Sequence, residues 1–167
     1  YLLDADKPFS IVSCVAGIKQ FYLHFHGTAA HAGGMAMSDR HDALAAAAAV
    51  ISAVENLAKE CSKDTRGTVG YISVLPCEHN IIPEDVTISV DFRETEDMTW
   101  EKLYTDLIEV TKQECAKRGL SWTVETNCDL RPAHCATELF HILEDAADGT
   151  GFENDRMISC HAHESMN

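Results

Sequence analysis

Two segments of strict alternation constrain the fold of this chain more than any other feature of its sequence. In residues 86–93, Val, Ile, Val and Phe alternate with Thr, Ser, Asp and Arg, and residues 18–26 alternate in the same way. Successive side chains of a β-strand point to opposite faces, so each segment is predicted to be a strand with one buried face and one polar face. We expect both strands to lie in a sheet that is covered on one side.

Two helical patterns lie between these strands and two further strand-like segments. Ser38 is a plausible N-cap for an Ala-rich helix, and Thr99 can cap a second helix that ends before Gly119. The further strands are predicted at residues 67–75 and 120–126. The resulting order, β-α-β-β-α-β over about residues 18–128, predicts an α+β ferredoxin-like sandwich, a four-stranded antiparallel sheet with two helices on one face.

The two ends of the chain do not look self-sufficient. A buried strand is predicted at residues 9–15, and a helix at about 137–148 is followed by a short strand near 157–159. Both ends would need a larger partner sheet to bury their apolar faces. We therefore predict that the middle domain is inserted into a second domain of which most is absent. The predicted boundaries are 1–16 for a stub of the second domain, 17–130 for the middle domain and 131–167 for a partial C-terminal segment.

Charge and cysteine usage exclude several classes of protein. With 13 basic and 27 acidic residues, the formal net charge of −14 would repel phosphate backbones, so no nucleic-acid partner is expected. No apolar stretch approaches the roughly 18 residues of a membrane-spanning helix, and the chain does not start with a signal-peptide pattern. The seven Cys form no CxxC pair, which argues against a disulfide framework and favours a reducing, cytoplasmic location.

A glycine-rich loop carries the first candidate for chemistry. His31 follows a predicted strand and precedes a predicted helix, within residues 27–37. An imidazole that reaches out of the domain from this position could donate a hydrogen bond to a developing oxyanion. The alternative is a loop histidine that makes only a local hydrogen bond.

Asn80 and Arg93 form the second candidate. Asn80 lies in a loop at the mouth of a strand, and Arg93 ends that strand on its polar face. An amide and a guanidinium can together hold a carboxylate, because the guanidinium fork matches two carboxylate oxygens. The alternative is a turn Asn and a surface Arg paired with Glu94 or Glu96.

The third candidate is near the end of the chain. His161 and His163 would share one face of a strand, and Glu164 follows. Neutral imidazoles suit zinc, but a catalytic zinc ion needs about three protein ligands, so these residues alone do not complete a site. An exposed His-rich stretch is the alternative.

Taken in order, these three segments resemble the hydantoinase/carbamoylase family of zinc amidohydrolases, which is related to dinuclear metallo-carboxypeptidases and aminoacylases. The family run G-x-A-x-H-A-G-x-x-P-M-x-x-R-x-D-A is matched from Gly27 to Ala43, with Ala36 in place of Pro. The N-x-I-P element and the D-x-R strand end are matched at Asn80 and Arg93. The S-G-A-G-H-D-A-M signature is matched at Ser159, His163 and Met166.

The resemblance implies roles for these residues. His31 would polarise the scissile carbonyl in the active site of a partner subunit, Asn80 and Arg93 would hold the substrate carboxylate, and His163 would bind a metal ion. The middle domain would be a lid through which the protein forms a homodimer. Two zinc or manganese ions are implied for each complete subunit, with most of their ligands upstream of this chain.

The function implied is hydrolysis of linear C–N bonds in a small carboxylate-bearing substrate, of the N-carbamoyl-L-amino-acid or allantoate type. Because this chain lacks most of the metal ligands, we expect it to be inactive alone. Two alternatives stay open. One is a non-catalytic dimerisation module, and the other is a peptidase or aminoacylase of the same superfamily.

Overall fold

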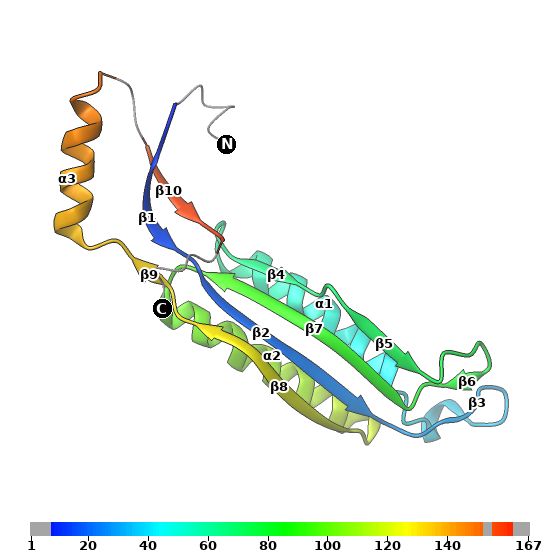
Figure 1. Cartoon of the computed structure of the whole chain (residues 1–167). Helices are drawn as coiled ribbons and strands as arrows, with labels where there is room; N and C mark the ends of the chain where they lie inside the picture. The colour runs from blue at the N-terminus through cyan, green and yellow to red at the C-terminus, as the bar shows by residue number, and fades with distance from the viewer. Residues whose placement is uncertain (1–7, 152–154, 162–167) are drawn as a thin grey trace.

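The computed structural model describes residues 8–151 and 155–161. A long twisted sheet carries two helices on one face, and a smaller sheet with a third helix lies at one end of it (Figure 1). The described part of the chain contains no helix that is long and apolar enough to cross a membrane.

The long sheet is antiparallel. It contains β2 (Gly17–His26), β4 (Arg66–Thr68), β5 (Ile72–Leu75), β7 (Asp85–Glu94) and β8 (Ser121–Leu130). The strand order is β4-β7-β2-β8, and β5 continues the edge that β4 begins by pairing with the other half of β7. With β4 and β5 counted as one interrupted edge strand, this is the predicted ferredoxin-like arrangement, which is thereby confirmed.

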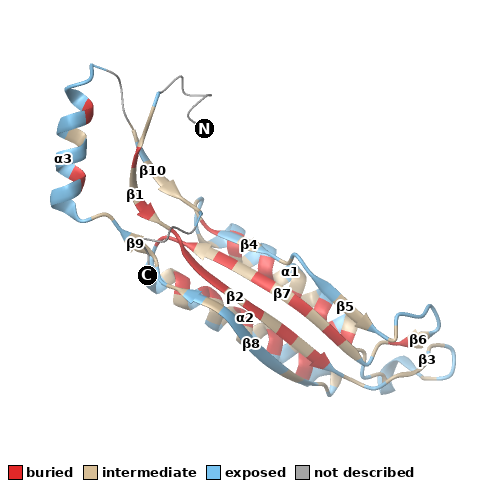
Figure 2. Ribbon diagram, in the orientation of Figure 1, coloured by how far each residue is buried: buried red, intermediate tan, exposed pale blue. Residues whose placement is uncertain are grey.

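The core lies between the sheet and the helices α1 (Ala43–Cys61) and α2 (Asp97–Arg118). Buried and less buried residues alternate along β7, as Figure 2 shows, and the same holds for most of β2. Each large apolar side chain buried in this way contributes about 1.5–3 kcal/mol. The inward-facing side chains from the two strands are Phe21, Leu23, Phe25, Val86, Ile88, Val90 and Phe92. No helix of the described residues covers the opposite face of the sheet (Figure 1).

Both predicted helix starts were wrong. Ser38 lies in a 3-10 turn, η1 (Met37–Asp39), and α1 begins at Ala43, where the carboxylate of Asp42 accepts a hydrogen bond from the Ala45 amide at 3.0 Å. The backbone is extended at Arg40, so no helix can run through it. Helix α2 begins at Asp97, two residues before Thr99, without a side-chain cap. The predicted C-terminal glycine, Gly119, is confirmed as a left-handed cap.

The strand predicted at residues 67–75 is interrupted. It divides into β4 and β5, and the intervening residues run through Gly70. A two-stranded ribbon was missed altogether: β3 (Ala30–His31) pairs with β6 (Ile81–Ile82). This ribbon projects from the end of the long sheet that lies farthest from the small sheet (Figure 1).

The small sheet joins the two ends of the chain. β1 (Ile11–Val15) lies between β10 (Arg156–Ser159) and β9 (Ala133–His134), and it is parallel to β10. The helix α3 (Thr137–Asp148) begins and ends as predicted and leaves Leu139, Ile142 and Leu143 exposed. The division between the two sheets falls near the predicted domain boundaries, which stay predictions.

Candidate functional site

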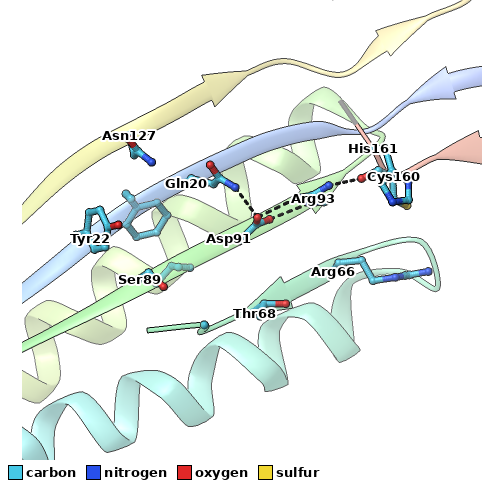
Figure 3. Close-up of a pocket in the computed structure, with 13 residues that line it drawn as sticks. Gln20, Tyr22, Arg66, Thr68, Ser89, Asp91, Arg93, Asn127, Cys160 and His161 are labelled. Atoms are coloured by element: carbon cyan, nitrogen blue, oxygen red, sulfur yellow. Dashed lines mark hydrogen bonds and ion pairs between the residues drawn. The ribbon is translucent and has the colours of Figure 1, made fainter. Parts of the chain in front are cut away.

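A cavity of about 690 Å³ lies on the open face of the long sheet. Successive side chains of a strand point to opposite faces of the sheet, so the polar side chains line this cavity while the apolar ones point into the core. These residues include Gln20 and Tyr22 of β2, Ser89, Asp91 and Arg93 of β7, and Arg66 of β4 (Figure 3). Cys160 and His161, which follow β10, close one end of the cavity.

Arg93 is held in this cavity by three hydrogen bonds. Its Nε and Nη2 groups donate to the two carboxylate oxygens of Asp91 at 3.0 and 3.1 Å, and Nη1 donates to the backbone oxygen of Cys160. The Gln20 side chain donates to the same Asp91 carboxylate at 2.7 Å. The guanidinium is thus fixed from two sides, and 26% of the side chain stays exposed.

The pairing shifts the pKa of both partners. Burial acts to raise the pKa of the Asp91 carboxyl, but hydrogen bonds from Arg93 and Gln20 outweigh it and hold the pKa below its usual value. The hydrogen bond to Asp91 raises the pKa of Arg93 despite its burial. Both groups are therefore charged at neutral pH.

The guanidinium of Arg93 keeps some of its donor capacity. An arginine has five N–H donors, and the bonds to Asp91 and Cys160 use three of them. Within residues 8–151 and 155–161, its other two N–H groups have no acceptor, and two is the number that a bidentate carboxylate requires. The arrangement can therefore bind a carboxylate while Asp91 holds the arginine in place.

His31 and Asn80 lie together at the other end of the sheet. His31 pairs with Ile81 across the β3–β6 ribbon, and the Ala32 amide donates to the Asn80 backbone oxygen at 2.8 Å. Both His31 and Asn80 are exposed. The sequence pattern thus identified two residues that share one tip of the molecule.

The local bonding of His31 determines its tautomer. The amide of Gly33 donates to the His31 Nδ1 atom at 3.1 Å, so that nitrogen must be an acceptor. In the neutral imidazole the proton is then on Nε2, which can act as a hydrogen-bond donor. The local hydrogen bond that the alternative interpretation of His31 predicted is therefore present. It leaves the Nε2–H group of the neutral ring as the donor.

Arg40 shapes the loop that carries His31, although its role was not predicted. Its Nη2 group donates to the backbone oxygens of Ala32 at 2.5 Å and Met35 at 3.2 Å. The only signal in the sequence was its place in the matched family run.

One chain does not bring Asn80 to Arg93. Arg93 lies near the end of β7, whereas Asn80 precedes the start of that strand. Eight residues of extended strand between positions 85 and 93 span about 26 Å. Within one chain the amide and the guanidinium are therefore too far apart to hold one carboxylate.

The metal-binding prediction is not tested by the described residues. His163 lies outside them, and His161 is exposed at the end of the cavity. Residues 8–151 and 155–161 contain no group of three or more His, Cys, Asp or Glu side chains arranged to hold a metal ion.

Comparisons with known proteins agree on the kind of protein that this chain resembles. A family profile described as the peptidase dimerisation domain matches residues 15–119. An N-carbamoyl-L-amino-acid amidohydrolase from a Pseudomonas species is 35% identical over 99% of this chain and 40% of that protein. Allantoate deiminase 1 from Glycine max is 34% identical over 84% of this chain and 33% of that protein.

A solved structure shows the same similarity in three dimensions. The amidase of the hydantoinase/carbamoylase family from Burkholderia vietnamiensis has a TM-score of 0.88 and 28% sequence identity. The match covers 97% of this chain and 39% of that one. This chain therefore spans 33–40% of the length of these three relatives.

Proposed function

This chain belongs to the peptidase dimerisation domain family, and we propose that it forms the lid, the dimer contact and the carboxylate clamp of a hydrolase of linear C–N bonds. The substrate class is an N-carbamoyl-L-amino acid or allantoate, the compounds that the names of its relatives indicate. The observation that carries this proposal is the fixed guanidinium of Arg93, two of whose N–H groups bind no other described residue and can bind a carboxylate.

The clamp is completed by a second copy of the chain. Because the strand from position 85 to position 93 alone spans about 26 Å and Asn80 lies beyond its start, a site that uses both Asn80 and Arg93 must take them from different subunits. In this arrangement the tip of one lid, with Asn80 and His31, reaches the cavity of its partner. Lid closure then excludes water from the substrate.

The exposed edge at β5 is the surface through which we propose that two copies associate. Among the strands of the described residues β5 pairs only with β7, and it exposes Ile72 and Leu75 by 48% and 57%. A free strand edge with apolar side chains favours pairing with a second strand. Light scattering on the double variant Ile72→Asp/Leu75→Asp should report a monomer, whereas Thr123→Asp on the opposite edge strand should leave the dimer intact.

His31 contributes to the reaction as a hydrogen-bond donor. Its Nε2–H would stabilise the oxyanion that develops when the carbonyl carbon of the scissile C–N bond is attacked. Removal of one such donor in another enzyme costs about 2.7–4 kcal/mol of transition-state stabilisation. Two zinc or manganese ions per complete subunit would activate the attacking water, with His163 as one ligand. These ions and that ligand remain proposals beyond the described residues.

A cytoplasmic location is proposed as well. All seven cysteines are free thiols. Free thiols persist in a reducing compartment.

Kinetic assays on the native protein that carries this sequence test the proposal. Hydrolysis of N-carbamoyl-L-amino acids or allantoate is expected, and Arg93→Ala should raise KM strongly because the carboxylate loses its bidentate partner. Arg131→Ala is the matched control, since Arg131 pairs on the surface with Asp97 and Glu101. Unchanged kinetics in Arg93→Ala would contradict the clamp.

The two alternatives give different results in the same assays. Hydrolysis of dipeptides or N-acyl amino acids in place of ureido compounds would favour a peptidase or aminoacylase. A stable dimer with no hydrolysis of any of these substrates would favour a non-catalytic dimerisation module.

A further inference from the structure

Arg66 lies directly beside Arg93 in the sheet. The register of β4 and β7 places the two residues opposite each other, so both side chains project from the same face. Directly opposite residues of antiparallel strands have Cα atoms about 4.5–5.5 Å apart. Both side chains extend toward the end of the sheet at which Cys160 and His161 lie (Figure 3).

Two like charges opposite each other destabilise a sheet unless another charge compensates them. Asp91 compensates Arg93. The Arg66 guanidinium donates only to the backbone oxygens of Lys63 at 2.8 Å and Thr65 at 2.9 Å, and within residues 8–151 and 155–161 it forms no ion pair. Among the described residues Arg66 thus lacks a carboxylate partner, as Arg40 does, but Arg66 differs in lying opposite a second arginine.

The backbone at Arg66 is held firmly in place. Gly67 lies so close to α1 that an added Cβ would be 2.9 Å from the Ala58 Cβ and 2.9 Å from the Val54 oxygen. On the other side, the buried carboxylate of Glu94 accepts a hydrogen bond from Thr65. The backbone of Arg66 is therefore anchored between two packed residues, and its exposed side chain starts from a fixed point of the sheet.

The side chain also has open space around it. Arg66 lines the large cavity and a neighbouring cavity of about 430 Å³. The second cavity is also lined by Lys63 and by Arg156, which pairs with Glu144 at 2.8 Å. Asp64 is the one acidic residue among the described residues that line it. The two cavities thus have an excess of basic groups, which attracts anions.

We propose that Arg66 binds a second acidic group of the substrate, so that this protein prefers N-carbamoyl or N-acyl derivatives of acidic amino acids. The inference rests on the proposed function, in which Arg93 holds the α-carboxylate. Aspartate and glutamate carry their two carboxylates only a few bonds apart, which matches two guanidinium groups from neighbouring strands. A neutral side chain would leave Arg66 unpaired.

Paired substrates of equal size test this inference in the native protein. We expect a higher kcat/KM for N-carbamoyl-L-glutamate than for N-carbamoyl-L-glutamine. Arg66→Gln should lower kcat/KM for the glutamate derivative by about 10–100-fold and leave the glutamine derivative nearly unchanged, since a hydrogen-bonded charge pair is lost only with the former. Lys112→Gln, on the exposed face of α2, is the control for the loss of one positive charge.

An equal ratio of the two kcat/KM values in the wild type and in Arg66→Gln would overturn the inference. Arg66 would then serve only as a charge that protects the edge strand from pairing with other chains.

Failure of the proposed function gives a different result, namely no hydrolysis of any N-carbamoyl or N-acyl amino acid. Calorimetric titration with N-carbamoyl-L-glutamate then decides. Binding to the wild type and Lys112→Gln but not to Arg66→Gln supports the subsite. Equal binding to all three proteins, or none to the wild type, refutes it.

Discussion

Glu94 links the end of β7 to the turn before β4, the two segments that carry Arg93 and Arg66. Replacing it should therefore show how much these bonds contribute to the free energy of unfolding. The Glu94 side chain is buried, with an exposed fraction of 1%. One carboxylate oxygen accepts the backbone amides of Thr95 at 2.7 Å and Glu96 at 3.3 Å. The other accepts the hydroxyls of Thr65 and Ser62, which belong to the turn before β4.

The magnitude follows from these bonds. Glu94→Gln keeps the shape and one acceptor, but it removes the charge that strengthens at least two close hydrogen bonds. A hydrogen bond to a charged group contributes about 1 kcal/mol more than a neutral one, so Glu94→Gln should reduce the free energy of unfolding by about 2 kcal/mol. Glu94→Ala should cost about 4 kcal/mol because it leaves buried donors unsatisfied and opens a cavity.

The pH dependence supplies a second test. Burial acts to raise the pKa of Glu94, but hydrogen bonds from Thr65, Thr95 and Glu96 outweigh it and lower the pKa below its ordinary value of 4.5. Because its pKa is lower in the folded state, the Glu94 carboxylate stabilises the fold fully at pH values above the ordinary pKa. This stabilisation is lost as the pH falls through the folded-state pKa. The difference between the wild type and Glu94→Gln should therefore shrink below pH 4.5.

Urea unfolding of the 167-residue chain at several pH values measures both effects. Glu55→Gln is the matched control, because Glu55 is exposed and pairs only with Lys59, so its stability should stay near that of the wild type. A loss below about 0.5 kcal/mol in Glu94→Gln at pH 7, the range of ordinary surface substitutions, would refute this account. So would a loss that stays constant as the pH is lowered.

Three further substitutions test local features of the lid. Asp42→Ala should reduce the free energy of unfolding by about 1 kcal/mol in thermal unfolding, because α1 loses the side chain that caps its first turn. Asp42→Asn should keep most of this stabilisation, since its side-chain oxygen can accept the same bond. Gly67→Ala should cost about 1–3 kcal/mol because its Cβ would overlap α1, whereas Gly70→Ala, with no neighbouring atom closer than 4.0 Å, should cost little. Arg40→Gln should speed hydrogen exchange in the His31 loop without changing it in the sheet, since two backbone oxygens lose their donor.

The fold could be predicted because its strongest signals are local. Alternation in β2 and β7 indicates which side chains enter the core, and the order of the elements limits the topologies that can bury them. The helix starts could not be predicted in the same way. Ser38 and Asp42 are both good capping residues, and the choice between them depends on Arg40, whose bonds hold the preceding loop in a non-helical path.

The sequence identified individual residues of the candidate site but not how they lie relative to one another. Asn80 and Arg93 are close in sequence, yet the extended strand between them carries them to opposite ends of the sheet. Arg66 was missed because an arginine before a glycine resembles a solvated turn residue. Only the register between β4 and β7 shows that it lies opposite Arg93.

Mixing of two variants that are each strongly impaired at substrate concentrations well below the KM of Arg93→Ala tests most directly the central claim that each site combines the tip of one subunit with the Arg93 cavity of the other. Arg93→Ala and His31→Gln are purified separately in the native protein, then mixed and allowed to exchange subunits. Random exchange of equal amounts makes about half of the dimers mixed, and one of the two sites in each mixed dimer keeps both residues. Hydrolysis should therefore recover to about a quarter of the wild-type rate. If the mixture stays no more active than the two variants alone although mixed dimers form, the site lies within one subunit and the account is wrong.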